Sequence, residues 1–212
     1  MQVRKDLDKF LNTLPKDITL VAATKYLDAA HMKEFLKFGV NNFGENRTDA
    51  FLDKYEALKD EKIIWHFIGH LQRNKALPVI NKIDYLHSLD SSKLADLIEK
   101  NVEKPLKCFV EVSINEEATK NGVKVDELDN FIERLLTYKK IELVGLMMMS
   151  IKYSDEESLN KQFSRLVDVK RHLEDKFNIK IPYLSMGMSD DYHAAIKNGA
   201  THIRLGRILL EE

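Results

Sequence analysis

Short apolar runs alternate with segments of helical spacing along the whole 212-residue chain. The apolar runs predict eight strands, at about residues 18–25, 41–45, 63–69, 84–89, 107–114, 142–149, 181–186 and 201–206. An opening helix is predicted near residues 2–14, and later helical spacing is clearest over residues 125–140 and 158–177. Parallel strands need crossover connections, which are usually helices. The alternation therefore predicts a single-domain (β/α)₈ barrel of the TIM type over residues 1–212.

An open, doubly wound sheet is the alternative architecture that the same alternation allows. Its dinucleotide fingerprint, G-x-G-x-x-G, is missing after the first predicted strand, which leads instead into Thr24, Lys25 and Tyr26. Linkers, low-complexity segments and internal repeats are not evident in the sequence. The best candidate for a domain break, Asn115 to Gly122, has the composition of a short polar loop. One domain remains the simpler prediction.

The charge balance and the single cysteine exclude several classes of function. The 33 Lys and Arg against 34 Asp and Glu give a net charge of -1, which predicts no general affinity for nucleic acid or anionic membranes. Cys108 lies in an apolar run and has no partner for an internal disulfide, so we predict a buried thiol. No apolar stretch approaches the roughly 20 residues that span a bilayer, and the N-terminus lacks the apolar block of a secretory signal. We expect a soluble, cytoplasmic protein.

The segment from Leu184 to Arg207 has the order strand, polar end, helix, strand, glycine. The first amides of a helix lack intrahelical partners, and phosphate groups suit that position. Ser189 stands at the entry to the helical residues and is the candidate phosphate ligand. The alternative is that Ser189 is only an N-cap, helped by Asp190 and Asp191 in the first turn. The segment indicates a site for a phosphorylated small molecule.

Two further features at predicted strand ends could complete such a site. Arg204 and Gly206 are two residues apart, so in a strand they face the same side. Arg204 offers a permanently charged donor, with a salt bridge as the alternative, and Gly206 lets a ligand approach the backbone closely. Lys25 closes the first strand at the rim of the barrel, where partial desolvation would lower the pKa of its amine and favour attack on an aldehyde. A solvated lysine at a strand end is the alternative.

Metal and simple nucleophile sites are not supported. His66 and His70 are four residues apart in a predicted strand, about 13 Å, which is too far for one metal ion. No G-x-S-x-G elbow is present, and Cys108 lies in the middle of a predicted strand. The run Met147 to Met149 is expected to fill the barrel. We predict no metal site.

Seven short motifs occur in one order from about Leu20 to Leu210, namely VAATK, FGEN, WHFIGHLQRNK, HSLDS, GLMMM, LSMGMSDD and IRLG. Through them the chain resembles the pyridoxal phosphate homeostasis proteins, whose barrel is similar to the N-terminal domain of alanine racemase. The resemblance implies that Lys25 carries the internal aldimine with pyridoxal 5′-phosphate (PLP) and that Asn46 lines the pocket.

The resemblance also assigns the cofactor's two polar ends. Ser189 and the backbone around Gly206 and Arg207 match the phosphate-binding positions, and Arg204 matches the arginine that faces the pyridine nitrogen. A permanent cation beside that nitrogen discourages its protonation and weakens the ring as an electron sink. Racemases of this type also need a second base from a separate β domain of a partner subunit, whereas this chain ends at Glu212, just after the last predicted strand.

The resemblance therefore implies a non-catalytic protein that buffers or delivers PLP and so affects amino-acid and keto-acid balance indirectly. Apoenzymes that use PLP are the expected transient recipients, and the protein itself is expected to be a monomer or to associate weakly. A racemase-like enzyme with Lys25 as its base, or a barrel for another phosphorylated metabolite, are the alternatives. The chain departs from the family pattern at Met148, at Leu210-Glu211 in place of Phe-Gly, and in a short lead before Lys25.

Overall fold

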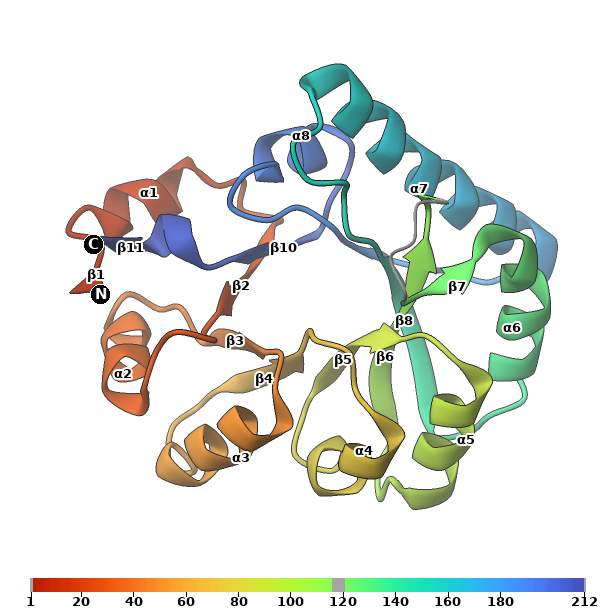
Figure 1. The fold of residues 1–212 in the computed structure, drawn as a ribbon, viewed down its shortest axis with the longest axis horizontal. Coiled ribbons are helices and arrows are strands. Elements are labelled where there is room, and N and C mark those ends of the chain that lie inside the picture. Colours follow the sequence, from red (N-terminus) through yellow and green to blue (C-terminus); the bar gives the residue numbers. More distant parts are fainter. Residues whose placement is uncertain (1, 116–120, 212) are drawn as a thin grey trace.

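The computed structural model describes residues 2–115 and 121–211, and within these ranges eight parallel strands form a closed ring (Figure 1). The ring strands are β2 (Thr19–Ala23), β3 (Asn42–Glu45), β4 (Ile64–Phe67), β5 (Tyr85–Leu89), β6 (Leu106–Ser113), β8 (Ile141–Met147), β9 (Tyr183–Ser185) and β10 (His202–Leu205). The pairings of β10 with β2 and of β5 with β6 close the ring. The predicted (β/α)₈ barrel is confirmed, and the open-sheet alternative is wrong.

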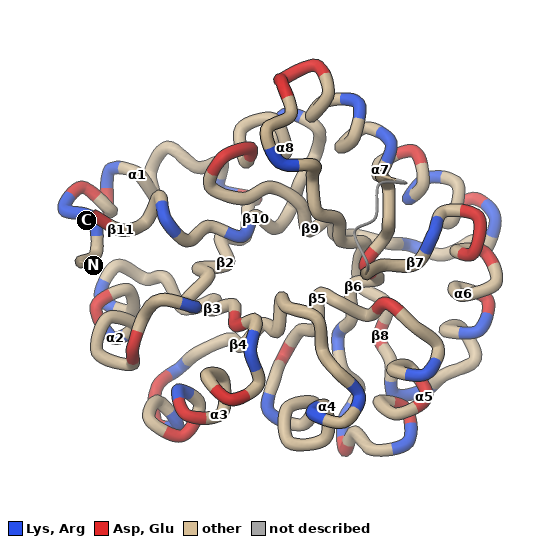
Figure 2. Tube along the Cα trace, in the orientation of Figure 1, with Lys and Arg blue, Asp and Glu red and all other residues tan. Residues whose placement is uncertain are grey.

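Helices surround the ring and connect its strands (Figure 1). They are α1 (Leu7–Thr13), α2 (Ala29–Lys37), α3 (Thr48–Ala57), α4 (Arg73–Ile80), α5 (Ser92–Asn101), α6 (Leu128–Leu135), α7 (Glu156–Phe177) and α8 (Tyr192–Lys197), with 3₁₀ turns η1 (Val125–Glu127) and η2 (Arg207–Leu209). Asp28 caps α2 by accepting a hydrogen bond from the His31 backbone N–H, and Gly39 follows its end with φ +78°. Charged residues of both signs lie mixed along these helices (Figure 2). None of the described helices is long and apolar enough to cross a bilayer.

The two ends of the chain differ from the prediction. Residues Gln2–Val3 form β1, which pairs antiparallel with β11 (Leu210–Glu211), so that the described ends lie side by side (Figure 1). The opening helix therefore begins only at Leu7. Because both strands of this pair are two residues long and distant in sequence, neither shows a strand pattern locally.

At the carboxyl end of the barrel, the first ring strand is shorter than predicted, and a two-residue strand follows the loop after β6. The strand predicted to end at Lys25 ends at Ala23, because Leu27 N–H donates to the Thr24 carbonyl at 2.9 Å and turns the chain. The polar loop predicted from Asn115 to Gly122 includes residues 116–120, which lie outside the described residues. After it, β7 (Val123–Lys124) pairs in parallel with β6.

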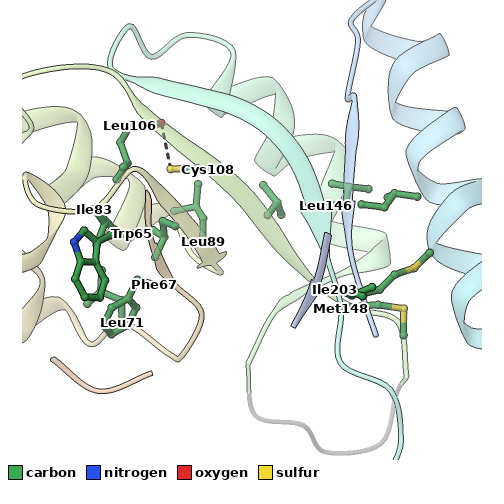
Figure 3. Close-up of a cluster of buried hydrophobic side chains, with 14 of the residues drawn as sticks. Trp65, Phe67, Leu71, Ile83, Leu89, Leu106, Cys108, Leu146, Met148 and Ile203 are labelled. Atoms are coloured by element: carbon green, nitrogen blue, oxygen red, sulfur yellow. Dashed lines mark hydrogen bonds between the residues drawn. The ribbon is translucent and has the colours of Figure 1, made fainter. Parts of the chain in front are cut away.

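Apolar side chains fill the space between strands and helices (Figure 3). Cys108 is fully buried among them, with Sγ 3.5 Å from the Leu106 carbonyl oxygen, and burial raises the pKa of its thiol. The predicted buried thiol is thus confirmed. Met147 and Met148 are buried as expected, but Met149 is 40% exposed, so the third methionine does not fill the barrel.

Candidate functional site

The residues predicted from the sequence lie at or near the carboxyl ends of four strands that are neighbours in the ring, in the order β3, β2, β10, β9. Asn46 follows β3, Lys25 follows β2, Ser189 follows β9, and Gly206 follows β10, which carries Arg204. Barrel closure makes the first and last ring strands direct neighbours. It therefore brings Lys25 to the same end of the barrel as the segment around Gly206, as a parallel barrel requires.

Lys25 lies in the turn beyond β2 and is exposed, with Nζ 4.6 Å from the centroid of the Tyr26 ring. The predicted desolvation of this lysine is wrong, because the strand ends two residues earlier and the turn lifts the side chain into solvent. Within the described residues, no carboxylate pairs with its amine. Asn46 is also exposed, and its side chain makes no hydrogen bond to the other described residues.

The turn that carries Lys25 is held by a buried polar cluster of Thr24, Glu45 and Lys54. Lys54 Nζ, from α3, donates to the Thr24 carbonyl at 2.6 Å and to Glu45 Oε1 at 2.5 Å. The Thr24 hydroxyl also donates to Glu45 Oε1, and Glu45 is fully buried. Sequence reasoning missed Lys54. The available signal was Glu45 itself, because a carboxylate closing an apolar strand needs a cationic or hydrogen-bonding partner.

Ser189 lies beside η2, the 3₁₀ turn that follows β10. Its Oγ accepts hydrogen bonds from the backbone N–H groups of Gly206 at 3.3 Å and of Ile208 at 3.5 Å. The alternative that Ser189 is only an N-cap is wrong, because α8 begins at Tyr192 with Asp191 before it. The amides that converge on Ser189 come from the segment after β10 and not from the start of α8.

The two aspartates beside Ser189 are both engaged elsewhere. Asp191 is buried and accepts hydrogen bonds from the Met188 N–H at 2.6 Å and from the Ser150 hydroxyl. Asp190 is exposed and pairs with the Arg207 guanidinium at 2.5 Å. The Arg207 side chain therefore lies at the surface, and only its backbone belongs to the segment that faces Ser189.

Arg204 is buried, with 4% of its surface exposed. Its Nη1 donates to Ser185 Oγ at 2.7 Å, and Nη2 donates to the Met148 carbonyl at 3.0 Å and contacts Met149 Sδ at 3.2 Å. The salt-bridge alternative is wrong for the described residues, since these direct partners are all neutral. Burial lowers the pKa of Arg204 to about 10, which leaves it cationic at neutral pH, and Asp191 and Glu111 act in the opposite direction.

Glu111 of β6 is a second ionisable group inside this end of the barrel, and sequence reasoning missed it. It is 9% exposed, and its carboxyl makes no hydrogen bond to the described residues. Burial raises the pKa of its carboxyl to about 7, and the charge of Asp90 adds to this, while Arg204 and His70 lower it. Its position inside the strand 107–114, among apolar neighbours, was the only local signal of an inward-facing acid.

The structure separates the two histidines that resembled a metal pair. His66 is fully buried in β4, whereas His70 lies beyond β4 and its Nδ1 is 2.9 Å from Asp90 Oδ2. Across residues 2–115 and 121–211, no group of three or more His, Cys, Asp or Glu side chains is placed to hold a metal ion.

Comparisons with known proteins show the family to which the chain belongs. The chain matches the family described as "Alanine racemase, N-terminal domain" over residues 2–211. It is 38% identical to a pyridoxal phosphate homeostasis protein of Aquifex aeolicus over 196 residues, which is 91% of this chain and 86% of that protein. It is 32% identical to the pyridoxal phosphate homeostasis protein of Escherichia coli, covering 91% of this chain and 84% of that one.

Solved structures show the same fold. PipY of Synechococcus elongatus PCC7942, solved with PLP bound, superposes with a TM-score of 0.90 at 28% identity, covering 97% of this chain and 100% of PipY. Alanine racemase of Corynebacterium glutamicum superposes with a TM-score of 0.79 at 13% identity, covering 99% of this chain and 63% of the racemase, which shows a shared fold alone. By its matched family and its relatives, the chain belongs to the pyridoxal phosphate homeostasis proteins, which are built on the alanine racemase N-terminal domain.

Proposed function

We propose that this chain binds PLP covalently through Lys25 and serves to buffer or deliver the cofactor. The observation that carries the proposal is the grouping, on adjacent strands, of a solvent-accessible amine, a set of backbone donors and a buried cation. When bound, PLP supplies an aldehyde that reacts with amines and a pyridine ring that can accept electrons. The relatives of this chain are named pyridoxal phosphate homeostasis proteins, and PipY has been solved with PLP bound.

The donor set of the site fits the polar groups of PLP. A phosphate needs N–H and O–H donors, and the N–H groups of Gly206 and Ile208 converge on Ser189 Oγ, so that two N–H donors and one O–H donor lie together. Gly206 also leaves room, since a Cβ built there would meet nothing closer than the Ala23 carbonyl oxygen at 3.4 Å. The pyridine nitrogen needs one donor, which Arg204 can supply because its present acceptors use only part of its five N–H groups.

Each residue then has a defined task in binding. Lys25 provides the amine, and its exposed turn leaves that amine accessible to an incoming aldehyde. Ser189 with the Gly206 and Ile208 amides would hold the phosphate, with Asn46 at the rim of the pocket. Arg207 would contribute its backbone only, because its guanidinium pairs with Asp190.

The charge of Arg204 supports a carrier and not a catalyst. Reactions at the α-carbon of an amino acid are favoured by withdrawal of electrons into a protonated pyridine ring. A buried guanidinium disfavours a second positive charge beside it and so keeps the ring nitrogen unprotonated. We therefore propose that the chain has no catalytic residues.

The binding proposal is tested by titration of the protein with PLP, reduction with borohydride, and peptide mapping of the stable adduct. We expect a new absorbance band in the visible range and an adduct at Lys25 that is lost in Lys25→Ala. Lys82→Ala is the matched control, since Lys82 is also exposed and lies over a tyrosine ring, 5.5 Å from the centroid of Tyr55. An adduct that forms on another lysine, or the lack of any band, overturns the proposal.

The non-catalytic part has its own test. A panel of amino acids is incubated with the PLP-loaded protein in deuterated solvent, and exchange at the α-carbon is followed by NMR. We expect no exchange above that of free PLP. Sustained exchange that also depends on Lys25 would make the chain an enzyme.

The proposal extends to the protein's oligomeric state, cellular location and partners. We propose that residues 1–212 act as one domain and one monomer in the cytoplasm, and that PLP-dependent apoenzymes are transient recipients. Light scattering after size exclusion tests the monomer, and cell fractionation tests the location. Activation of an apoenzyme by the loaded protein, compared with the same concentration of free PLP, tests delivery.

A further inference from the structure

A chain of four hydrogen bonds crosses the interior of the barrel and ends on Arg204. Arg204 Nη1 lies 2.7 Å from Ser185 Oγ, and Ser185 Oγ lies 2.8 Å from His87 Nδ1. His87 Nε2 is 2.9 Å from His66 Nδ1, and His66 Nε2 is 2.9 Å from Asn42 Oδ1. The strands β5 and β9 are not neighbours in the ring (Figure 2), so the hydrogen bond between His87 and Ser185 crosses the interior of the barrel.

With both histidines neutral, the acceptor at the Asn42 end determines the direction of every hydrogen bond in this series, and Arg204 at the other end is consistent with it. A guanidinium can only donate, and an amide oxygen can only accept. His66 Nε2 therefore donates to Asn42 Oδ1, and the Nδ1 of a neutral His66 must accept from His87 Nε2. The Nδ1 of a neutral His87 then accepts the single proton of Ser185, whose Oγ accepts from Arg204.

The surroundings keep both histidines neutral, as this direction requires. Ser185, His66 and His87 are all fully buried. Burial lowers the pKa of His66 to about 3, and His202 adds to this. Burial also holds the pKa of His87 well below its usual value, with further lowering by His66, Arg204 and His202.

Aromatic rings hold the two imidazoles in place. The His66 ring stacks on Tyr85 of β5 with centroids 4.7 Å apart and an interplanar angle of 4°. The His87 ring stacks on Phe109 of β6 at 4.3 Å and 24°. Each ring is thus restrained both in its plane, by hydrogen bonds, and across its face, by stacking.

We propose that Ser185, His87 and His66 are positioning residues that hold Arg204 in one orientation as a fixed donor to the bound ligand's ring nitrogen. This inference rests on the proposed function for its ligand, PLP, and on the hydrogen-bond chain for its mechanism. Since the Ser185 hydroxyl donates its proton in a hydrogen bond to His87, the lone pairs of Ser185 Oγ stay directed toward Arg204. A guanidinium restrained in this way cannot turn away when the ligand leaves.

The series of four hydrogen bonds is tested without any ligand or substitution. In ¹⁵N-labelled protein at neutral pH, long-range ¹H–¹⁵N correlation spectra distinguish the two neutral tautomers of histidine and the imidazolium. We expect both His66 and His87 to be neutral and protonated on Nε2. A proton on Nδ1 of either ring, or a charged ring, overturns the proposal.

The positioning role is tested by the spectrum of bound PLP. Ser185→Ala removes the acceptor for Arg204. Ser88→Ala is the matched control, because Ser88 is equally buried but donates to the Gly69 carbonyl at 2.6 Å and takes no part in the hydrogen bonds to Arg204. We expect Ser185→Ala to keep the Lys25 adduct, to bind PLP about tenfold more weakly, and to move the pH midpoint of its absorbance bands. Ser88→Ala should leave both unchanged.

The outcomes separate the two proposals. An unsubstituted protein that forms no Lys25 adduct overturns the proposed function, and the tautomers then decide whether the hydrogen-bond chain exists. A normal adduct whose affinity and pH midpoint are the same in Ser185→Ala as in the unsubstituted protein overturns the positioning role. Should Ser185→Ala fail to fold, the tautomer measurement still stands, because it uses the unsubstituted protein.

Discussion

Lys54 Nζ donates a hydrogen bond of 2.6 Å to the carbonyl of Thr24, the residue immediately before Lys25. The same amine pairs with the fully buried Glu45. A helix on the outside of the barrel is thereby connected to the turn that presents the proposed covalent lysine. The accessible Lys25 amine and the rigid backbone beneath it are thus provided by different residues, which is the usual division between a reactive group and its support.

We expect Lys54→Met to affect both stability and binding. Removing one partner of a buried ion pair leaves Glu45 uncompensated and should lower the free energy of unfolding by about 3 kcal/mol. The turn at Lys25 also loses its anchor, so PLP should bind more weakly. Chemical denaturation and PLP titration measure the two effects.

The control for this substitution is Lys161→Met, because Lys161 pairs with Glu157 at 2.6 Å on the exposed face of α7. An exposed pair contributes about 0.5 kcal/mol or less. Adding Glu45→Gln to Lys54→Met should recover part of the lost stability, since Glu45→Gln removes the buried carboxylate charge that has lost its partner. Equal losses for the Lys54 and Lys161 variants would contradict the proposed support of the turn.

Gly187 in the loop between β9 and Ser189 is predicted to tolerate no side chain. Its φ is +92°, and a Cβ there would lie 2.6 Å from the Ala195 Cβ on α8. Gly199 has a similar φ of +87° but open space around it. Gly199→Ala should therefore cost only the backbone strain, about 1 kcal/mol, whereas Gly187→Ala should cost clearly more and also weaken PLP binding. Thermal melts and PLP titration of both variants check this, and equal effects would show that the α8 contact is unimportant.

Stability should fall as the pH drops below about 6.5, because of buried neutral histidines. The folded pKa is about 3 for His66 and about 4 for His202, both below the unfolded value of 6.5. Between the folded and the unfolded pKa values, the histidines bind protons in the unfolded chain but stay neutral in the folded barrel. The free energy of unfolding therefore rises with pH in this window. The slope should be roughly 1 to 3 kcal/mol per pH unit. Denaturation curves from pH 4.5 to 8 measure it, and a flat profile would contradict buried neutral rings.

Glu111 should act in the opposite direction. Its folded pKa of about 7 lies above its ordinary value of 4.5, so the folded state keeps a proton that the unfolded chain releases between these values. This contribution is present below pH 4.5 and is lost as the pH rises to 7. Glu111→Gln should therefore stabilise the protein above pH 7 by about 1 to 3 kcal/mol and have little effect near pH 4.5.

The exposed Glu142 of the neighbouring strand β8 provides the comparison for Glu111. Glu142→Gln should change stability by less than about 0.5 kcal/mol at either pH. A Glu111→Gln variant that is less stable than the unsubstituted protein above pH 7 would show that attraction to Arg204 outweighs burial of the carboxyl.

Much of the fold was predictable because its signals are local. Each of the eight ring strands overlaps a predicted apolar run, and the caps around α2 follow from Asp28 and Gly39. The errors have a common cause. The strand β1 exists only through pairing with β11, and the desolvation of Lys25 was inferred from a strand that ends at Ala23. In both cases a contact between residues, and not the local pattern, decided the outcome.

By itself the sequence determined the alternation of strands and helices, the barrel that follows from it, and the strand ends where a phosphorylated ligand could bind. Those properties depend on the spacing of apolar residues within short segments. The tertiary structure alone decided which polar groups meet. Lys54 and Thr24 are 30 residues apart, and His87 and Ser185 are 98 apart. The first contact forms only when β2 and β3 pair, and the second only when the ring closes, because tertiary packing buries these polar groups and each must then find a partner within the fold.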